Sequence, residues 1–452
     1  MGDEAAIAQG GTDTELGAAA VELLRGLIRI DTSNPPGNER PAQELLAGTL
    51  TDAGFDCELL GALQDRPNLI ARLRGAAPGP TLCLLGHVDT VPADPSEWTH
   101  EPWSADLDGG AVWGRGAQDM KGQVAAFVTA ATALGREGWR PAAGELLVVV
   151  TADEERGAEI GAHWLCERHP EKVRADMVVN EGGGPWFELG GRRYYTLAVG
   201  EKGIFRFRIR TRGRAGHASV PALGDNALLR MARVLERLRS QPEPVPTEEG
   251  LALLRVILGP EAPGDAAEAL DGTLDELRDR APLLSAYLVE PMLRVTMTPT
   301  QAVASEKENV IPSRAEVLVD CRVPPGMGQA EVERDVERLL GPSGESFETV
   351  FGERVPGNSS PAASPLAEAI ADWVAENDPG ATLAPIVMPG FSDSHWFRRA
   401  FPEAVVYGFC PQRKMSMLEV APLIHCADER VLAGDVEYAA RFFSDLTRRV
   451  LG

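Results

Sequence analysis

The stretch TLCLLGHVD, residues Thr81–Asp89, is a short apolar run that ends in polar side chains. Two later runs, ELLVVVTADEE (Glu145–Glu155) and DMVVNE (Asp176–Glu181), also pass from aliphatic residues to acids. Runs of this length predict buried strands, and patterns of helical spacing lie between them, near residues 122–134 and 160–168. Strands that alternate with helices in this way predict an α/β fold with a mostly parallel central sheet.

Potential metal ligands follow the three predicted strands directly. In open α/β sheets, ligands bind beyond the carboxyl ends of the strands, so side chains at these ends converge. A single acid at such a place is equally well explained as a solvated loop residue, whereas the whole set predicts a metal site. The set comprises His87, Glu154, Glu155, Glu181 and, in a Gly-rich loop just before a helix, Asp119.

The spacing of these residues suits metal-assisted hydrolysis. His87 and Asp89 are two residues apart, so in a strand both point to the same side, and Asp89 can accept a hydrogen bond from the ring N–H that does not face the metal. One imidazole and several carboxylates suit Zn²⁺, and Co²⁺ or Mn²⁺ would also fit them. On a turn, Glu154 and Glu155 aim differently, so that one binds metal while the other acts as general base towards a water.

The pattern of the chain changes near residue 198. The stretch GIFRFRIRTR (Gly203–Arg212) alternates apolar and basic residues, which is typical of a strand with one face in water. With the elements that follow, the order is β-α-β-β-α-β, a ferredoxin-like unit. Residues 241–288, rich in Pro, Glu and Asp, lie inside this unit and are expected to form a helical insertion.

The α/β pattern returns after this unit, which predicts a discontinuous domain. We expect residues 1–197 and 358–452 to form the α/β catalytic domain and residues 198–357 to form a smaller α+β domain. The smaller domain is expected to be a lid or a dimerisation module. Its exposed strand Gly203–Arg212 would pair edge to edge with a second copy, giving a homodimer.

Composition and charge exclude several functional classes. The 452 residues carry a formal net charge of −23, which repels nucleic acid and anionic membrane surfaces, so neither is an expected partner. The sequence has no run of 18 or more apolar residues, so we expect no membrane-spanning helix. The acidic N-terminal stretch lacks an apolar signal region, so we expect a cytoplasmic protein. Six scattered cysteines without a CxxC pair are expected to be free thiols.

Six motifs, taken together and in this order, resemble the M20 metallopeptidase family: GHVDTVP, WGRGAQDMKG, VTADEE, VNEGG, GRAGHAS and HCADER. That family includes aminoacylases, succinyl-diaminopimelate desuccinylase, acetylornithine deacetylase and glutamate carboxypeptidases. The similarity runs from about residue 28 to about residue 430. It implies a zinc-peptidase-like catalytic domain and hydrolysis of the amide bond of a small peptide or an N-acyl amino acid.

The resemblance also implies a co-catalytic site with two Zn²⁺ ions per subunit. Asp119 would bridge the two ions. His87 and Glu181 would complete the shell of one ion, and Glu155 and a C-terminal histidine would complete the other.

Two histidines late in the chain, His395 and His425, are candidates for that last ligand, and the residues alone do not separate them. The resemblance favours His425, because it precedes Glu429 as in the closing His-x-x-x-Glu of the family.

Catalytic roles follow from the same resemblance. Glu154 would be the general base that activates the bridging water, and Asp89 would orient His87. His217 would polarise the scissile carbonyl, often from the partner subunit of a dimer, where a donor aimed at the developing oxyanion stabilises the transition state.

Three further residues resemble substrate contacts of the family. These are Asn309, Arg322 and Gly390, the last in a loop expected to close over the substrate carboxylate. A guanidinium matches a carboxylate in a bidentate fork, which suits Arg322 to the α-carboxylate. The competing interpretation of Arg322 is a surface arginine at a strand edge.

Two alternative functions compete with hydrolysis by two metals. The first is a catalytically inactive metal-binding or regulatory protein on the same scaffold, which would have no need of Glu154 as a base. The second is a cysteine hydrolase, in which Cys426 beside His425 would be the nucleophile. Neighbours in sequence rarely adopt the geometry that such a pair requires.

Overall fold

The computed structural model describes residues 2–262, 267–344 and 346–452, and the chain divides into two compact units. Unit 1 comprises the residues up to Val199 together with Ser360–Pro385 and Ser392–Gly452, and unit 2 comprises Gly200–Ser359 and Ile386–Phe391. The stretch Ile386–Phe391 carries Gly390 and groups with unit 2, although the sequence pattern placed it in the second part of the α/β domain.

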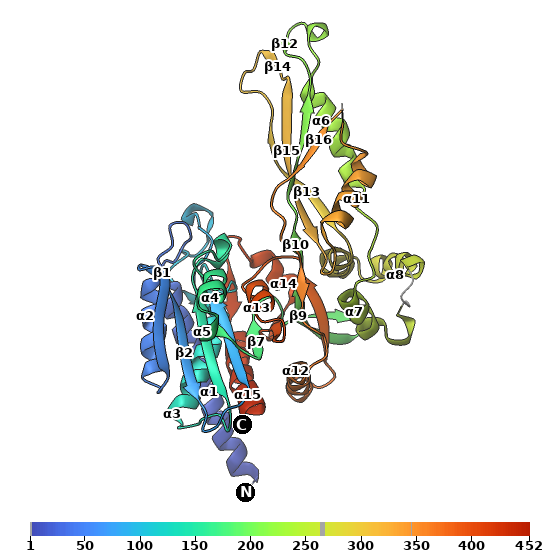
Figure 1. The fold of residues 1–452 in the computed structure, drawn as a ribbon. Coiled ribbons are helices and arrows are strands. Elements are labelled where there is room, and N and C mark those ends of the chain that lie inside the picture. Colours follow the sequence, from blue (N-terminus) through green and yellow to red (C-terminus); the bar gives the residue numbers. More distant parts are fainter. Residues whose placement is uncertain (1, 263–266, 345) are drawn as a thin grey trace. The chain divides into compact units, whose positions relative to one another are not determined.

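A large mixed sheet forms the centre of unit 1 (Figure 1). Its main path has the order β1-β2-β6-β3-β7-β19-β9-β8-β20, and β18 (Thr382–Met388) also pairs with β9. In that order, the strands of the path are β1 (Asp56–Leu63), β2 (Arg66–Arg74), β6 (Glu145–Thr151), β3 (Thr81–His87), β7 (Met177–Asn180), β19 (Val405–Gly408), β9 (Arg192–Glu201), β8 (Pro185–Leu189) and β20 (Gln412–Ser416).

The sheet is mixed, with its longest parallel run in the middle and a further parallel pair, β8 and β20, at one end. Strands β6, β3, β7 and β19 run parallel to one another, whereas β2 joins β6, and β9 joins β19, in antiparallel pairing. The α/β class is therefore confirmed, and the parallel arrangement that we expected holds for the strands that carry the site. An apolar run shows that a strand is buried, but it does not encode the direction of its neighbour.

The register of the parallel strands brings their carboxyl ends together. Strands β3 and β6 pair Gly86 with Val150 and His87 with Thr151, so both strands end at the same level. Strand β7 pairs Val179 with Leu84 of β3 and therefore ends beside them.

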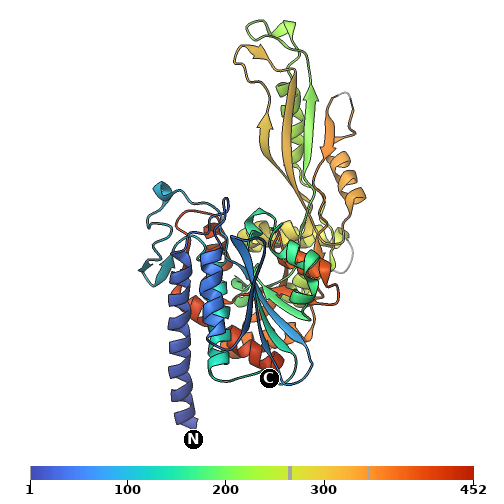
Figure 2. The same ribbon diagram turned by 60° about the vertical axis from the view of Figure 1, so that its left-hand side comes forward.

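Helices cover both faces of this sheet. On one face α1 (Gly2–Ile28), α3 (Lys121–Arg136) and α15 (Ala433–Leu451) pack against one another. Helix α2 (Arg40–Thr51) packs on α3, α12 (Pro365–Asn377) packs on α15, and Figure 2 shows α1 and α2 on the same side of the strands.

The opposite face of the sheet carries α4 (Ala162–Arg168), which is followed by α5 (Pro170–Val173) and packs on α13 (Ser394–Ala400). Alternate side chains of a strand point to opposite faces. Leu82 and Leu84 of β3 belong to the core under α1 and α3, whereas Cys83 points the other way and lies near Cys166 of α4.

The largest core of unit 1 lies between the sheet and the α1–α3–α15 layer. Val148 and Val150 of β6 point into it and are fully buried. Phe127 of α3 meets Phe443 of α15 edge to face, with ring centroids 5.8 Å apart. Burying one such ring contributes about 1.5–3 kcal/mol, so this layer anchors the strands whose ends carry the site.

Unit 2 contains the ferredoxin-like arrangement that the sequence predicted. Its sheet is antiparallel with the order β13-β15-β11-β16, and its core packs α6 and α11 on one face. The elements are β10 (Gly203–Ile204), β11 (Phe207–Arg212), α6 (Ala227–Leu235), β13 (Thr296–Val303), β15 (Arg314–Val323), α11 (Gln329–Leu340) and β16 (Glu348–Phe351).

The expected strand Gly203–Arg212 is interrupted and is not at an edge of the sheet. It divides into β10 and β11, and β11 lies between β15 and β16. Phe207 and Ile209 are buried while Arg208 and Arg210 reach the surface, so the alternation was interpreted correctly. Edge-to-edge pairing through this strand was wrong, because both of its edges already have partners.

The segment between α6 and β13 forms the helical insertion. It contains α7 (Glu248–Leu258), α8 (Ala267–Arg280) and α10 (Glu290–Leu293). The buried Lys202 joins it to the start of unit 2, since its Nζ donates to the carbonyls of Pro291 and Arg294, both at 2.7 Å.

Two further expectations concern the whole described chain. All six cysteines are free, as their spacing predicted. Within the described ranges, every helix is either too short or too polar to cross a bilayer.

Replacing Lys202 with methionine is expected to destabilise unit 2 by roughly 2–4 kcal/mol, because two partly buried carbonyls would lose their donor. Urea unfolding followed by circular dichroism measures the loss, and hydrogen exchange in α10 and β13 locates it. The matched control is Lys307→Met, at an exposed lysine of the same unit. Equal unfolding midpoints for the two variants would contradict the assigned role of Lys202.

Candidate metal centre

The five side chains predicted as metal ligands lie together in unit 1. His87 ends β3, Glu155 follows β6, Glu181 follows β7, and Asp119 precedes α3. Ligand atoms of His87, Asp119 and Glu155 lie within 4.8 Å of one another, as do those of His87, Glu154 and Glu181.

Asp119 occupies the centre of this cluster. Its Oδ1 lies 3.2 Å from Nε2 of His87, and its Oδ2 lies 3.1 Å from Nε2 of His425. One carboxylate thus faces two imidazoles through its two oxygens. That is the arrangement required of a ligand that bridges two cations.

Glu154 and Glu155 aim in different directions, as expected for neighbours on a turn. Oε2 of Glu154 lies 3.8 Å from Nε2 of His87, whereas Oε2 of Glu155 lies 3.1 Å from Nε2 of His425. The divergence arises where β6 ends, because Asp153 has a left-handed conformation with φ 68° before a single 3₁₀ turn, Glu154–Arg156.

The structure separates His425 from His395. His425 lies in a loop near the C-terminus and contacts Asp119 and Glu155. His395 lies on α13, where its ring packs edge to face on Trp396 at 5.1 Å. Burial and nearby Arg398 lower the pKa of His395 to about 4.

Asp89 contacts His87 through two atoms. The backbone carbonyl of Asp89 lies 2.9 Å from Nδ1 of His87, and Oδ1 of its carboxylate lies 3.6 Å from the same nitrogen, as the spacing predicted. The carboxylate also accepts from the backbone N–H groups of Glu154, at 3.1 Å, and Glu155, at 3.2 Å. The Asp89 carboxylate therefore faces both the His87 ring and the backbone of the two glutamates.

Glu429 is a structural part of the site for which the sequence reasoning had no role. Its fully buried carboxylate accepts from Arg115 at 2.6 Å and from the backbone N–H groups of Gly116, Gln118 and Asp119 at 2.8–3.0 Å. It therefore ties the loop that carries Asp119 to the segment that carries His425. The spacing His-x-x-x-Glu was the available signal.

The cluster carries an excess of negative charge. Burial raises the pKa of the Glu154 carboxyl well above its usual value, and burial together with Asp119 raises the pKa of Glu181 to about 8. Hydrogen bonds with Asp119 and Glu155 raise the pKa of His425 to about 10. Burial alone would raise the pKa of Asp119, but its hydrogen bonds with His425 and His87 hold it well below its ordinary value.

These residues fit a pair of divalent cations. Oε1 of Glu155 is a buried carboxylate oxygen without a hydrogen-bond partner, as expected of an oxygen that binds a cation. The two histidines and the carboxylates form the nitrogen and oxygen donor set that Zn²⁺ accepts. The raised pKa values mean that these acids and His425 tend to hold protons. Metal binding would displace those protons.

The remaining predicted site residues lie in unit 2. His217 is exposed on β12 (Gly216–His217), which pairs with β14 (Val310–Ile311). Asn309 lies beside it, since its carbonyl accepts from the N–H of Ala218 at 3.0 Å. The structure thus brings His217 and Asn309 together, as expected for two substrate contacts.

Arg322 and Gly390 lie elsewhere in unit 2. Strand β15 begins at Arg314, on the side of the two-stranded β12–β14 sheet, and Arg322 is eight residues further along, roughly 26 Å away at the rise of a strand. Its Nε donates to Asp320 at 2.7 Å, so its fork is already partly engaged. Gly390 follows β18, near the carbonyl of Met388 that accepts from the N–H of Lys202.

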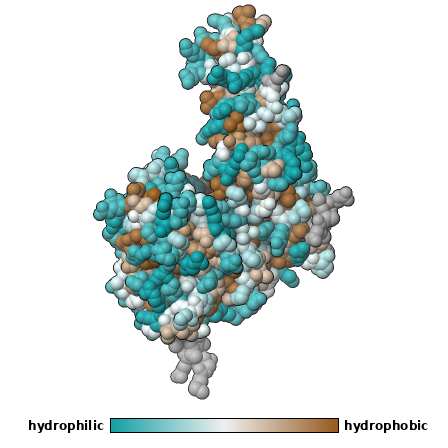
Figure 3. Space-filling view, viewed as in Figure 1, coloured by the Kyte–Doolittle hydropathy of each residue, from teal (hydrophilic) through white to brown (hydrophobic). Residues whose placement is uncertain are grey.

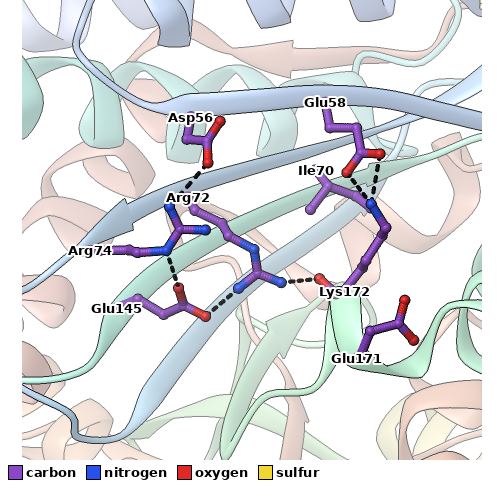
Figure 4. A pocket seen from close by; sticks show the side chains of 8 residues that line it. All are labelled: Asp56, Glu58, Ile70, Arg72, Arg74, Glu145, Glu171 and Lys172. Atoms are coloured by element: carbon purple, nitrogen blue, oxygen red, sulfur yellow. Dashed lines mark hydrogen bonds and ion pairs between the residues drawn. The ribbon is translucent and has the colours of Figure 1, made fainter.

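A separate hollow of about 450 Å³ lies on β1, β2 and β6 of unit 1 (Figure 4). Its basic groups are already paired: Arg72 with Glu145, Arg74 with Asp56, and Lys172 with Glu58. These pairs neutralise one another, and the lining holds no histidine or cysteine. The hollow is therefore a poor candidate for catalysis.

Comparison with known proteins identifies one family. Residues 83–449 match the family described as peptidase family M20/M25/M40. A succinyl-diaminopimelate desuccinylase from Alkalilimnicola ehrlichii is 29% identical over 448 residues, which cover 96% of this chain and 99% of the relative. The enzyme of the same name from Xanthobacter autotrophicus is 36% identical over 229 residues, which cover 49% of this chain and 57% of the relative.

Solved structures have the same fold. An M20 family metallo-carboxypeptidase from Sulfolobus solfataricus superposes with a TM-score of 0.69 at 18% identity, over 96% of this chain and 99% of the other. Human carnosine dipeptidase 1 gives 0.66 at 16% identity, over 97% and 98%. A dinuclear metal binding peptidase of the M20 family from Bacillus subtilis gives 0.59 at 15%, over 97% and 99%.

Substitution of the two late histidines is expected to separate their roles. The unmodified protein should retain two equivalents of Zn²⁺ after dialysis, and His425→Gln should retain about one, because Glu155 would lose its partner ligand. His395→Gln is the matched control and should retain two. Elemental analysis measures the content, and an unchanged stoichiometry in His425→Gln would exclude His425 as a ligand.

Proposed function

This chain belongs to peptidase family M20/M25/M40, and we propose that it is a two-metal hydrolase of the amide bond in N-acyl amino acids or small peptides, with Glu154 as general base. The position of Glu154 carries the proposal. Its carboxylate faces the metal cluster at 3.8 Å from His87, while its neighbour Glu155 faces His425. A protein that only stored or sensed metal would have no use for this further acid.

Two cations, Zn²⁺ in our proposal, would be held by Asp119 between them, by His87 and Glu181 on one side, and by Glu155 and His425 on the other. Bound there, they would polarise the scissile carbonyl and lower the pKa of a water towards neutrality. Because the same ligands accept Co²⁺ or Mn²⁺, the metal should be identified on the purified protein.

The protein's own groups move the proton. Glu154 takes a proton from the attacking water and returns it to the leaving nitrogen, so one residue is first base and then acid. Two bound cations would oppose the effect of burial on the pKa of Glu154 and favour the carboxylate form that a general base needs. His217 donates a hydrogen bond to the carbonyl oxygen as negative charge develops there, and Asn309 beside it binds the substrate. Arg322, roughly 26 Å further along β15, would bind the same substrate only from another copy of the chain.

N-acyl amino acids are the substrate class to test first, because the relatives that align along the whole chain are named succinyl-diaminopimelate desuccinylase. A panel of N-succinyl and N-acetyl amino acids and dipeptides should contain a substrate. Hydrolysis should stop on chelation and return with Zn²⁺, Co²⁺ or Mn²⁺. Thiol alkylation should have no effect, which separates this mechanism from a cysteine hydrolase.

A homodimer is the second part of the proposal. Four exposed apolar side chains lie on α6 and the turn before it: Val220, Leu223, Leu228 and Leu229. Figure 3 shows apolar patches interspersed on the mostly hydrophilic surface of unit 2. Burying such a surface against a second copy removes it from water, and it replaces the edge pairing of β11 that the fold excludes.

Replacing Glu154 with glutamine is expected to lower kcat by roughly 10²- to 10⁴-fold, because the amide cannot accept the proton. The metal content should remain at two equivalents. The matched control is Glu159→Gln, at an exposed acid of the following turn, which should keep full activity. If Glu154→Gln turned over at the rate of the control, Glu154 would have no part in the mechanism.

Mixing two inactive variants tests whether His217 acts across a dimer. His217→Ala and Glu154→Gln should each be nearly inactive alone. After subunit exchange, half of the dimers are mixed and each contains one intact site, so about a quarter of the full activity should return. No recovery, in a mixture shown by mass spectrometry to contain mixed dimers, would place His217 in the same subunit as the Glu154 that it serves.

A further inference from the structure

A buried asparagine lies directly behind the paired glutamates of the site. Asn34 belongs to the stretch DTSNPPG (Asp31–Gly37), which lies between α1 and α2. Its Nδ2 donates to Oδ2 of Asp89 at 2.9 Å and to Oδ1 of Asp153 at 3.0 Å. A side-chain amide nitrogen has two hydrogens, so both donors are used and each carboxylate receives one.

The two carboxylates that Asn34 joins hold the turn on which Glu154 and Glu155 lie. Asp89 accepts from the backbone N–H groups of both glutamates. Asp153 provides the left-handed residue that reverses the chain after β6, and its side chain does not cap the turn that follows. Asn34 therefore links Asp89, which holds the backbone of the two glutamates, to Asp153, where the chain bends.

Asn34 is itself held rigidly. Its N–H donates to the carbonyl of Thr90 at 2.8 Å, and the N–H of Thr90 donates to the carbonyl of Thr32 at 3.2 Å. The segment thus runs beside the residues that follow β3. Asn34 is 4% exposed, so water does not compete for its amide.

Arg66 supports the same assembly from the other side. Its guanidinium contacts Oδ1 of Asp153 at 3.2 Å and donates hydrogen bonds to the fully buried carboxylate of Glu39. It also lies against Gly37, where an added Cβ would come within 2.2 Å of Nε. Since Gly37 has φ +82°, both space and conformation require glycine at that position.

We propose that Asn34 is a positioning residue that makes the adjacent Glu154 and Glu155 face different parts of the metal cluster. The proposal rests on the proposed function and adds a residue to it. Outer groups that orient metal ligands typically change metal affinity or activity 10- to 100-fold when they are replaced.

The physical requirement is a neutral double donor between two acids. Aspartate at position 34 has the same size, but it donates nothing and adds a third negative charge beside Asp89 and Asp153. Alanine leaves both carboxylates without this donor. Serine retains one donor, so it can satisfy one carboxylate but not both.

The test compares Asn34→Asp, Asn34→Ser and the matched control Asn38→Asp. Asn38 lies just beyond the same turn, is exposed and donates to the carbonyl of Asp31 at 3.2 Å. Zn²⁺ titration against a chromophoric chelator measures the affinity of each of the two sites without any substrate. Steady-state kinetics then separates kcat from KM, and circular dichroism melts show whether each variant is folded.

We expect Asn34→Asp to weaken one Zn²⁺ site roughly 10- to 100-fold and to lower kcat by a similar factor, with KM little changed. Asn34→Ser should lie between Asn34→Asp and the unmodified protein, and Asn38→Asp should match the unmodified protein. If Asn34→Asp does not fold, Asn34→Ser decides in its place. Unchanged affinities and kcat in a folded Asn34 variant, or equal weakening in Asn38→Asp, would overturn the proposal.

The proposal for Asn34 and the proposed function can fail independently of each other. If Glu154→Gln remained fully active, the assignment of Glu154 as general base would fail. The Zn²⁺ affinities of the Asn34 variants would still report whether Asn34 positions Glu155. Wild-type affinities in these variants, with Glu154→Gln inactive, would remove the role of Asn34 and leave the base in place.

Discussion

Repulsion among buried carboxylates is the constraint on which unit 1 depends. Asp119, Glu154, Glu155 and Glu181 are shielded from water, and two imidazoles are the only neutralising groups within the cluster as described. A carboxylate that loses its hydration must find a positive charge close by or take up a proton. The raised pKa values of Glu154 and Glu181 express that requirement. Divalent cations meet it without protonating the ligands, which is why this arrangement is best explained as a metal centre.

The scaffold holds these acids in place at two levels. Parallel strands with matched register bring His87, Thr151 and Asn180 to one edge of the sheet, but a strand end leaves the direction of the next side chains undetermined. Buried polar side chains define that direction. Glu429 binds the loop of Asp119 through three backbone N–H groups, and Asn34 joins the two carboxylates that hold the glutamate turn. The catalytic geometry is thus built from segments at both ends of the chain.

Local patterns predicted some features well and others not at all. The alternation in Gly203–Arg212 identified which side chains are buried, but an interior strand and an edge strand alternate alike, so the pattern did not show that β11 has two neighbours. The spacing of His87 and Asp89 suggested a side-chain contact. The Asp89 carboxylate does lie 3.6 Å from Nδ1 of His87, but the spacing did not show that its backbone carbonyl makes the closer contact or that the carboxylate also anchors Glu154 and Glu155.

The sequence by itself determined the α/β class, the ferredoxin-like unit and the acids at the strand ends, because apolar runs and the polar residues that close them are local properties of the chain. From the residues alone, the last ligand was open between His395 and His425, and no role was assigned to Asn34. Only the tertiary structure shows the contacts of His425 with Asp119 and Glu155 and those of Asn34 with Asp89 and Asp153. They depend on which distant segments meet, and the meeting of segments is set by packing in the core and by burial of charge, neither of which is encoded in the spacing of any one stretch.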